Sequence, residues 1–77
     1  MRLDKYLKVS RLIKRRTVAN EACDGGLVLV NGKAARASYE VKVGDRISLK
    51  MGSRAVTVEV TAVQEAARQG EILYREV

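Results

Sequence analysis

Residues 2–16, RLDKYLKVSRLIKRR, carry seven basic side chains and a single acidic one, Asp4. All other positions together hold eight bases and eight acids, so this stretch accounts for the whole net charge of +6. A pI near 9.9, with the net charge concentrated in one stretch of the sequence, favours a polyanionic partner, namely RNA, DNA or anionic lipid. A helix face that is merely solvated usually mixes acids with bases. We therefore interpret this stretch as the functional surface and the remaining residues as its support.

The spacing of apolar residues predicts a short helix over residues 2–10. At about 100° per residue, one arc of this helix is apolar and is expected to face the core. That arc contains Leu3, Tyr6, Leu7 and Val9, with Ser10 among them. The opposite arc, expected to face solvent, contains Asp4, Lys5, Lys8 and Arg11. In this first turn Asp4 is also placed to offset the helix dipole and to orient Arg2 or a neighbouring base.

A second helix is predicted over residues 18–24, with Thr17 as its N-cap and Gly25-Gly26 as its end. Its apolar face would consist of Val18, Ala19, Ala22 and Cys23. Leu12 and Ile13 are expected to anchor the connection between the helices to the core. Lys14, Arg15 and Arg16 then come directly before the helix N-terminus, where unpaired amides add positive potential. This arrangement predicts a binding corner for an anion such as phosphate.

From residue 27 the apolar period becomes that of strands, and Asn31-Gly32 is a strong hairpin signal. Strands are predicted over 27–30, 46–51 and 55–63, with a weak strand or extended segment over 33–38, a polar loop over 64–70 and a short edge strand over 72–77. The predicted fold class is α+β: two short N-terminal helices packed on a small curved antiparallel sheet of three to five strands. We expect one domain over residues 1–77, with its core at about 1–63 and a short tail at 64–77.

The residue types that usually carry catalysis are scarce. There is no histidine, the carboxylates are scattered, and Cys23 is expected to be a small buried hydrophobe. Asp45 follows Gly44 in a predicted turn, where side-chain-to-backbone hydrogen bonding accounts for it. We predict no catalytic residue, metal or cofactor, and so no enzyme. A single cysteine, no signal segment and no spanning run favour a cytoplasmic protein.

Two further interpretations remain open. Tyr39 lies in a polar stretch where it is able to stack on a nucleotide, whereas Tyr6 shares the apolar arc and belongs to the core. The basic helix would also suit a membrane surface, through Lys5, Lys8 and Arg11 on anionic lipid. Against this alternative, the apolar arc is needed to cover the sheet, and the chain has no Trp or Phe to insert. We therefore expect RNA and no membrane.

The ordered pattern R-L-D-K-Y-L, S-R-L-I-K-R-R-T, G-G-L-V-L-V-N-G-K and V-K-V-G-D-R-I resembles the S-four domain, a small RNA-binding domain named after the fourth small-subunit ribosomal protein. The resemblance covers about residues 1–60 and implies the αL RNA-binding motif. The chain looks most like the stand-alone bacterial members that act in ribosome-associated quality control. It also resembles, less closely, the heat-shock relative that binds large ribosomal subunits carrying stranded nascent chains.

The resemblance implies a non-enzymatic factor that binds rRNA and tRNA on obstructed large ribosomal subunits. Such a factor steadies the P-site tRNA while an RqcH-type partner adds a C-terminal alanine tail to the stalled chain. The alternatives are a heat-shock-type factor that recycles such subunits, or an RNA-binding accessory domain of an RNA-modifying enzyme. We expect a monomer.

The charge pattern and the resemblance together select the RNA-binding residues. The primary contacts are predicted to be Arg2, Lys5, Lys8, Arg11, Lys14, Arg15 and Arg16. Asn31 and Lys33, at the hairpin turn, are predicted to be secondary contacts. We expect Arg16 to matter more than Lys8, because Arg16 lies beside the amides of the second helix and a guanidinium binds phosphate with two hydrogen bonds.

Overall fold

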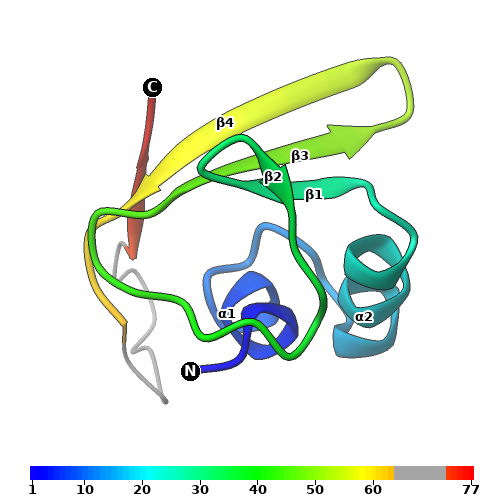
Figure 1. The fold of residues 1–77 in the computed structure, drawn as a ribbon, viewed down its shortest axis with the longest axis horizontal. Coiled ribbons are helices and arrows are strands. Elements are labelled where there is room, and N and C mark those ends of the chain that lie inside the picture. The colour runs from blue at the N-terminus through cyan, green and yellow to red at the C-terminus, as the bar shows by residue number, and fades with distance from the viewer. Residues whose placement is uncertain (64–72) are drawn as a thin grey trace.

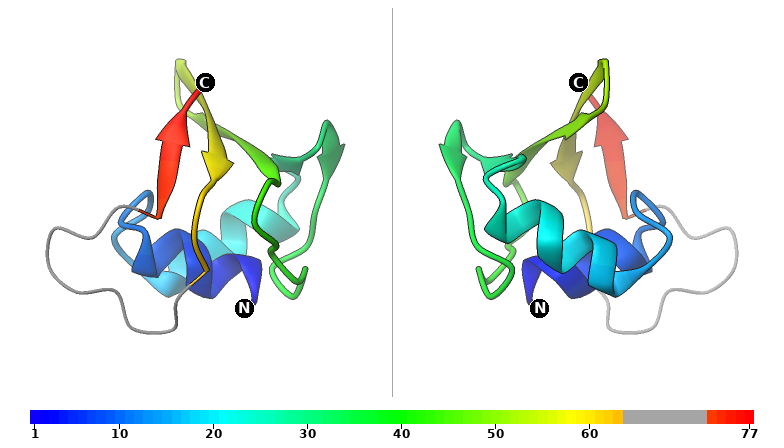
Figure 2. Two further views of the ribbon diagram at one scale, coloured as in Figure 1. Left: turned by 90° about the vertical axis from the view of Figure 1, so that its left-hand side faces the viewer. Right: turned by 90° about the vertical axis from the view of Figure 1, so that its right-hand side faces the viewer.

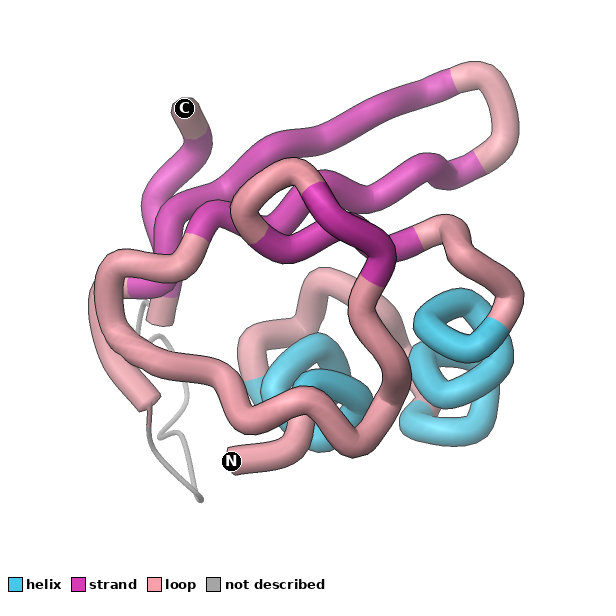
Figure 3. Tube along the Cα trace, viewed as in Figure 1, coloured by secondary structure: helices cyan, strands magenta, loops and turns pink. Residues whose placement is uncertain are grey.

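Two helices followed by five strands make up the described part of the chain, which in this computed structural model is residues 1–63 and 73–77. The helices are α1 (Leu3–Val9) and α2 (Arg16–Asp24), and the strands are β1 (Val28–Val30), β2 (Lys33–Ala34), β3 (Arg46–Met51), β4 (Arg54–Val60) and β5 (Tyr74–Glu76). Both helices lie on the same side of the sheet (Figures 1 and 3). The predicted α+β fold class is therefore confirmed.

The five strands form one sheet in the order β2-β1-β3-β4-β5, and every neighbouring pair is antiparallel. In the β3–β4 register Ile47 lies opposite Val58, and both side chains are buried. Ser48 and Thr57, the next pair, are half-buried on the other face and share a hydrogen bond of 3.2 Å. This alternation leaves one apolar face, which the helices cover as the sheet curves over them (Figure 2).

The core is aliphatic and lies between the helix pair and this face of the sheet. Its largest fully buried side chains are Tyr6, Leu3, Leu7, Ile47, Leu49, Leu73, Val28, Val58 and Val60. The α1 members stand three and four positions apart, as expected for one stripe of a helix. Ile13, in the connection between the helices, is also buried, so the predicted anchor there is confirmed.

The solvent-facing arc predicted for α1 is wrong at one position. Asp4 is only 2% exposed, although it was expected to point to solvent with Lys5, Lys8 and Arg11. Lys8 and Arg11 are indeed exposed, whereas Lys5 is half-buried. The reason is that the first turn of α1 faces α2, which supplies polar partners for a buried carboxylate. A helical-wheel argument on one helix does not include such a neighbour.

Two predictions for α2 are also wrong. Thr17 is not the N-cap: the helix begins at Arg16, and the extended residue Arg15 is its cap, without a side-chain hydrogen bond. Val18, expected on the buried face, is 49% exposed, because the helix turns mainly Ala19 and Cys23 toward the core. The predicted glycine end is confirmed, since α2 ends at Asp24 and Gly26 follows in the left-handed region with φ of 79°.

The hairpin between β1 and β2 turns at the predicted Asn31-Gly32 pair. Both residues have positive φ, 52° and 84°, as a type I′ turn requires. Residues 33–38 were expected to form a weak strand or an extended segment, and only Lys33 and Ala34 pair with β1 as a strand. After Ala35, whose amide still donates a 3.1 Å hydrogen bond to Val28 O of β1, the backbone leaves the sheet. It then runs along the helix pair, where Tyr39 O accepts a hydrogen bond of 2.8 Å from Leu3 N.

The last described residues complete both the sheet and the core. β5 pairs with the outer side of β4, which confirms the predicted edge strand, and the preceding Leu73 is 1% exposed. The buried Tyr6 hydroxyl donates a 2.7 Å hydrogen bond to Leu73 O. The region assigned to a tail after residue 63 thus includes a core residue, Leu73. The loop expected over 64–70 lies outside the described residues.

Candidate nucleic-acid interface

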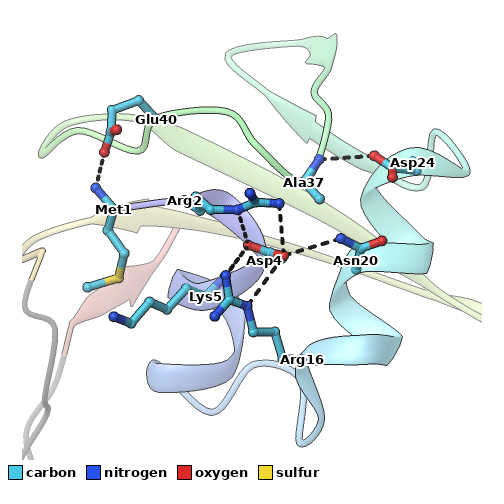
Figure 4. A network of polar contacts seen from close by, with 9 residues as sticks. All are labelled: Met1, Arg2, Asp4, Lys5, Arg16, Asn20, Asp24, Ala37 and Glu40. Carbon is cyan, nitrogen blue, oxygen red and sulfur yellow. Dashed lines mark hydrogen bonds and ion pairs between the residues drawn. The ribbon is translucent and has the colours of Figure 1, made fainter.

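The buried carboxylate of Asp4 holds two arginines at the junction of the helices (Figure 4). Arg2 Nε lies 3.2 Å from Asp4 Oδ1, and Arg16 Nε lies 3.4 Å from Asp4 Oδ2. Asn20 of α2 donates a 3.3 Å hydrogen bond to Oδ2, and the Lys5 amide donates one of 2.8 Å to Oδ1. The expectation that Asp4 orients Arg2 or a neighbouring base is confirmed, and the neighbour is Arg16.

These contacts keep Asp4 ionised. Burial on its own would raise the pKa of Asp4, but hydrogen bonds from Asn20, Arg2, Arg16 and the Lys5 amide outweigh it and lower the pKa below its ordinary value. The side chain of Asp4 is 3% exposed, whereas those of Arg2 and Arg16 are 50% and 49% exposed. Each guanidinium is therefore fixed on its inner side and open to solvent on its outer side.

The other basic residues of the opening stretch surround this junction. Lys8, Arg11, Lys14 and Arg15 are exposed, and Lys5 is half-buried. Arg11 has a positive φ of 67°, a conformation that costs an L-residue about 1 kcal/mol and here reverses the chain after α1. The buried Ile13 holds the same turn through its amide, which lies 3.0 Å from Leu7 O. The structure thus gathers these bases around two short helices joined by an anchored turn.

The beginning of α2 also favours an anion. Its first turn contains no acidic residue, and its N-cap, Arg15, supplies no side-chain hydrogen bond to the free amides. Acidic side chains and caps are what normally stabilise this end of a helix. Their absence from α2, next to three consecutive bases, leaves the amides and the dipole available to an outside ligand.

The two residues predicted at the hairpin differ in their surroundings. Asn31 bridges strands, because its Nδ2 donates to Asp45 Oδ1 at 3.1 Å and its Oδ1 accepts from the Arg46 amide at 3.1 Å. Lys33 is exposed at the start of β2. The structure thus gives Asn31 an internal role, while Lys33 faces solvent on the strand that lies at the edge of the sheet.

A second buried carboxylate, Asp45, holds the long loop before β3. It accepts hydrogen bonds from the Tyr39 hydroxyl at 2.9 Å and from the Lys42 amide at 3.0 Å. Burial alone would raise the pKa of Asp45, but these hydrogen bonds and the one from Asn31 lower it. The hydrogen bond to Asp45 raises the pKa of the Tyr39 hydroxyl in turn. The predicted turn role of Asp45 is confirmed, and Tyr39 has its hydroxyl engaged.

Two residues near the junction were missed by the sequence analysis. Asn20 is polar on a helix face that was expected to be solvated, and only the tertiary structure pairs it with Asp4. Arg36 belongs to the part of the chain whose charges balance, so counting charges gave it no prominence. Together with Arg2, both residues line a cleft of about 430 Å³ between the helices and the loop after β2.

The chain's one cysteine behaves as expected. Cys23 is 2% exposed, and burial, with smaller contributions from the charges of Asp4 and Asp24, raises the pKa of its thiol to about 11. Such a thiol is protonated at neutral pH and unreactive.

In the part of the chain that the structure covers, neither helix is long and apolar enough to span a bilayer.

Comparisons with known proteins identify relatives. Residues 1–47, which span the helix pair, β1 and β2, match the family model of the S4 domain. The chain is 55% identical to the RQC P-site tRNA stabilizing factor of Halalkalibacterium halodurans, over 92% of this chain and 81% of that protein. It is 49% identical to the protein of the same name from Bacillus subtilis, over 92% and 83%.

A solved structure has the same fold. Vibrio cholerae Heat Shock Protein 15, described as trimeric, matches 100% of this chain and 81% of its own, with a TM-score of 0.91 and 34% sequence identity. The matched family model covers more than half of the chain, and it includes the Arg2–Asp4–Arg16 junction and the start of α2. The resemblance inferred from the ordered motifs is thereby confirmed, and the chain belongs to the S4 domain family.

Proposed function

We propose that this protein binds RNA through the exposed bases around the junction of α1 and α2, and performs no bond chemistry itself. The observation that carries the proposal is the pair of guanidiniums, from Arg2 and Arg16, held by one buried carboxylate and open on their outer sides. Arginines fixed in this way lose little side-chain entropy when they bind phosphate. The surrounding bases and the uncapped start of α2 supply further contacts for the backbone of a structured RNA.

The partner we propose is the large ribosomal subunit carrying a peptidyl-tRNA. Relatives of 55% and 49% identity are named RQC P-site tRNA stabilizing factors, and their names support tRNA in the P site as the ligand. In this role the protein contacts rRNA and tRNA together and steadies the tRNA while an RqcH-type factor adds the alanine tail. A cytoplasmic monomer fits such a role, and light scattering after gel filtration tests the monomer.

Salt dependence of binding to purified large subunits that carry peptidyl-tRNA tests the RNA interface. If four to six phosphates are neutralised, log K falls with log salt at a slope of about −3 to −5. Arg16→Ala is expected to weaken binding roughly tenfold, because it removes a fixed guanidinium. Lys8→Ala, which removes an exposed base from the same region, is the matched control and is expected to change binding about two- to threefold. A slope near zero, or equal losses for both variants, contradicts the proposed interface.

A second candidate is a factor of the heat-shock type that recycles large subunits with stranded peptidyl-tRNA. The TM-score of 0.91 to Vibrio cholerae Heat Shock Protein 15 favours it. The two roles differ in their product. Deleting the gene is expected to abolish alanine tails on stalled chains if the tRNA-stabilising role is correct. Tails that persist, with peptidyl-tRNA accumulating on large subunits, would favour the recycling role.

A further inference from the structure

The loop after β2 is fixed rigidly against the helix pair. Ala37 is its anchor, because its amide donates a 3.1 Å hydrogen bond to Asp24 Oδ1 at the end of α2 (Figure 4). The Ala37 carbonyl accepts a second hydrogen bond, of 3.2 Å, from the Asp4 amide in α1. Ala37 itself is only 3% exposed. The neighbouring Arg36 is therefore attached to a backbone that both helices hold in place, although it lies far from them in the sequence.

Arg36 lies where two surface hollows meet. The cleft beside the junction is lined by Arg2, Asn20, Asp24, Arg36, Ala37 and Ser38. A neighbouring hollow, which shares Arg36 and Ser38, leads to Lys33 and Tyr39 at the hairpin. On the other side a third hollow shares Asn20 and leads to Arg16 and Thr17 at the start of α2. Shared lining residues link the three hollows, and we call the surface that they cover the track. Arg16, Arg2, Arg36 and Lys33 are its bases, and the exposed acids Glu21 and Asp24 also line it.

The charge of Arg36 is not neutralised within the described structure. Arg36 is exposed, and across residues 1–63 and 73–77 its guanidinium makes no ion pair or hydrogen bond. The acid in the cleft, Asp24, already uses one carboxylate oxygen on the Ala37 amide. By contrast, Arg46 and Arg75 on the sheet both pair with Glu59. An arginine that has no partner among the described residues, on a rigid loop and next to another half-exposed arginine, is suited to bind an anionic backbone.

We propose that Arg36 contacts a phosphate of the bound RNA, so that the RNA-binding surface continues from the helices across the loop after β2. A single RNA backbone would follow the track from Arg16 past Arg2 and Arg36 toward Lys33. The inference rests on the proposed function, because it assumes that the junction of the helices binds RNA. It extends that function by adding a contact outside the basic opening stretch and a direction for the strand.

The test compares Arg36→Ala with Arg54→Ala in binding to purified large subunits that carry peptidyl-tRNA. Arg54 is a matched control, because it is also an exposed arginine but lies at the β3–β4 turn (Figures 1 and 2) and lines none of the three hollows of the track. Arg36→Ala is expected to weaken binding roughly tenfold, and to make the salt slope less steep by about 0.7 to 0.9. Arg54→Ala is expected to change affinity less than about twofold. Arg36→Lys keeps the charge and should retain the salt slope.

The outcomes separate this inference from the function beneath it. If Arg36→Ala and Arg54→Ala change the affinity equally while Arg16→Ala still weakens binding, the role of Arg36 is refuted and the helix interface stands. Salt-insensitive binding by the unchanged protein overturns the proposed function itself. Thermal unfolding of each variant checks the fold. A photo-crosslinking amino acid at position 36 provides a second measurement: crosslinks to RNA from position 36 and none from position 54 support the contact, and the reverse refutes it.

Discussion

Two groups of side chains in this protein each consist of one carboxylate and two arginines, but the two carboxylates differ in burial and in hydrogen bonding. At the helix junction Asp4 lies between Arg2 and Arg16, and on the sheet Glu59 lies between Arg46 and Arg75. The side chain of Asp4 is 3% exposed and also accepts from an amide and from Asn20. That of Glu59 is 24% exposed, with nitrogen–oxygen distances of 3.3 Å and 3.9 Å.

The comparison shows what a buried acid contributes to a basic surface. Exposed ion pairs like those of Glu59 are worth little, because water screens them and the side chains must be ordered. A buried carboxylate with several donors instead fixes the position of its arginines, because leaving it unpaired is costly. At the helix junction the acid therefore organises the bases, whereas on the sheet the acid mainly offsets their charge.

Of the substitutions that test this comparison, Asp4→Ala should have the largest effect on stability. The variant leaves Asn20 and two guanidiniums without their shared acceptor, and we expect unfolding free energy to fall by about 2–3 kcal/mol. Urea unfolding followed by circular dichroism measures the change. RNA affinity should fall as well, although the net charge becomes more positive. Unchanged stability, or tighter RNA binding, would mean that Asp4 does not organise the junction.

Acid should weaken the protein through the same carboxylate. Because the folded pKa of Asp4 lies below its ordinary value of 3.8, its contribution is complete above that value and is lost as the pH falls through the folded pKa. The loss should be smaller than for Asp4→Ala, since a protonated carboxyl still accepts hydrogen bonds. Unfolding free energies measured from pH 7 to pH 3 test this. Asp4→Asn should reduce the dependence of unfolding free energy on pH. Some dependence should remain, because the pKa of Asp45 is also lowered.

Tyr6→Phe should have an intermediate effect on stability, and it tests the contact between the helix junction and the sheet. The Tyr6 hydroxyl of α1 donates to Leu73 O, directly before the strand that carries Arg75. Removing it leaves a buried carbonyl without this donor and should lower unfolding free energy by about 1–2 kcal/mol. Tyr39→Phe, whose hydroxyl is bound to Asp45 instead, is the control for a general loss of a tyrosine hydroxyl. RNA affinity should not change in Tyr6→Phe.

Glu59→Gln should have the smallest effect on stability, because the comparison predicts that its exposed ion pairs contribute little. Both of its arginines are about two-thirds exposed, so we expect a change in unfolding free energy of about 0.5 kcal/mol or less. The same urea measurement, compared directly with Asp4→Asn, decides the question. A loss as large as that for Asp4→Asn would remove the distinction between the two groups.

Much of the fold follows from local patterns. The α1 stripe, the Asn31-Gly32 turn and the alternation in β3 each predicted their element, because period and turn chemistry act over a few residues. The errors concern contacts between elements. Asp4 was assigned to solvent because nothing local indicates that Arg16 and Asn20 would face it. Thr17 was assigned as the cap because its residue type fits, although the helix begins one position earlier than Thr17.

The candidate site divides in the same way. Its charge was evident from residues 2–16, and the order of motifs correctly indicated the S4 domain family. The contacts assigned to the individual bases stay predictions, to be tested by the variants above. Arg36 was not predicted, because its charge lies in a balanced part of the chain and becomes important only where the loop meets the helices.

From the sequence alone follow the sign of the surface, the two helices, the hairpin and the family, since each depends on composition or on neighbours a few residues apart. Only the tertiary structure decides which bases are fixed and which are free. Burial of Asp4 requires α1 and α2 to pack together, and the position of Arg36 requires Ala37 to bond to both helices. Both depend on contacts between distant residues, and such contacts form only when the chain has folded.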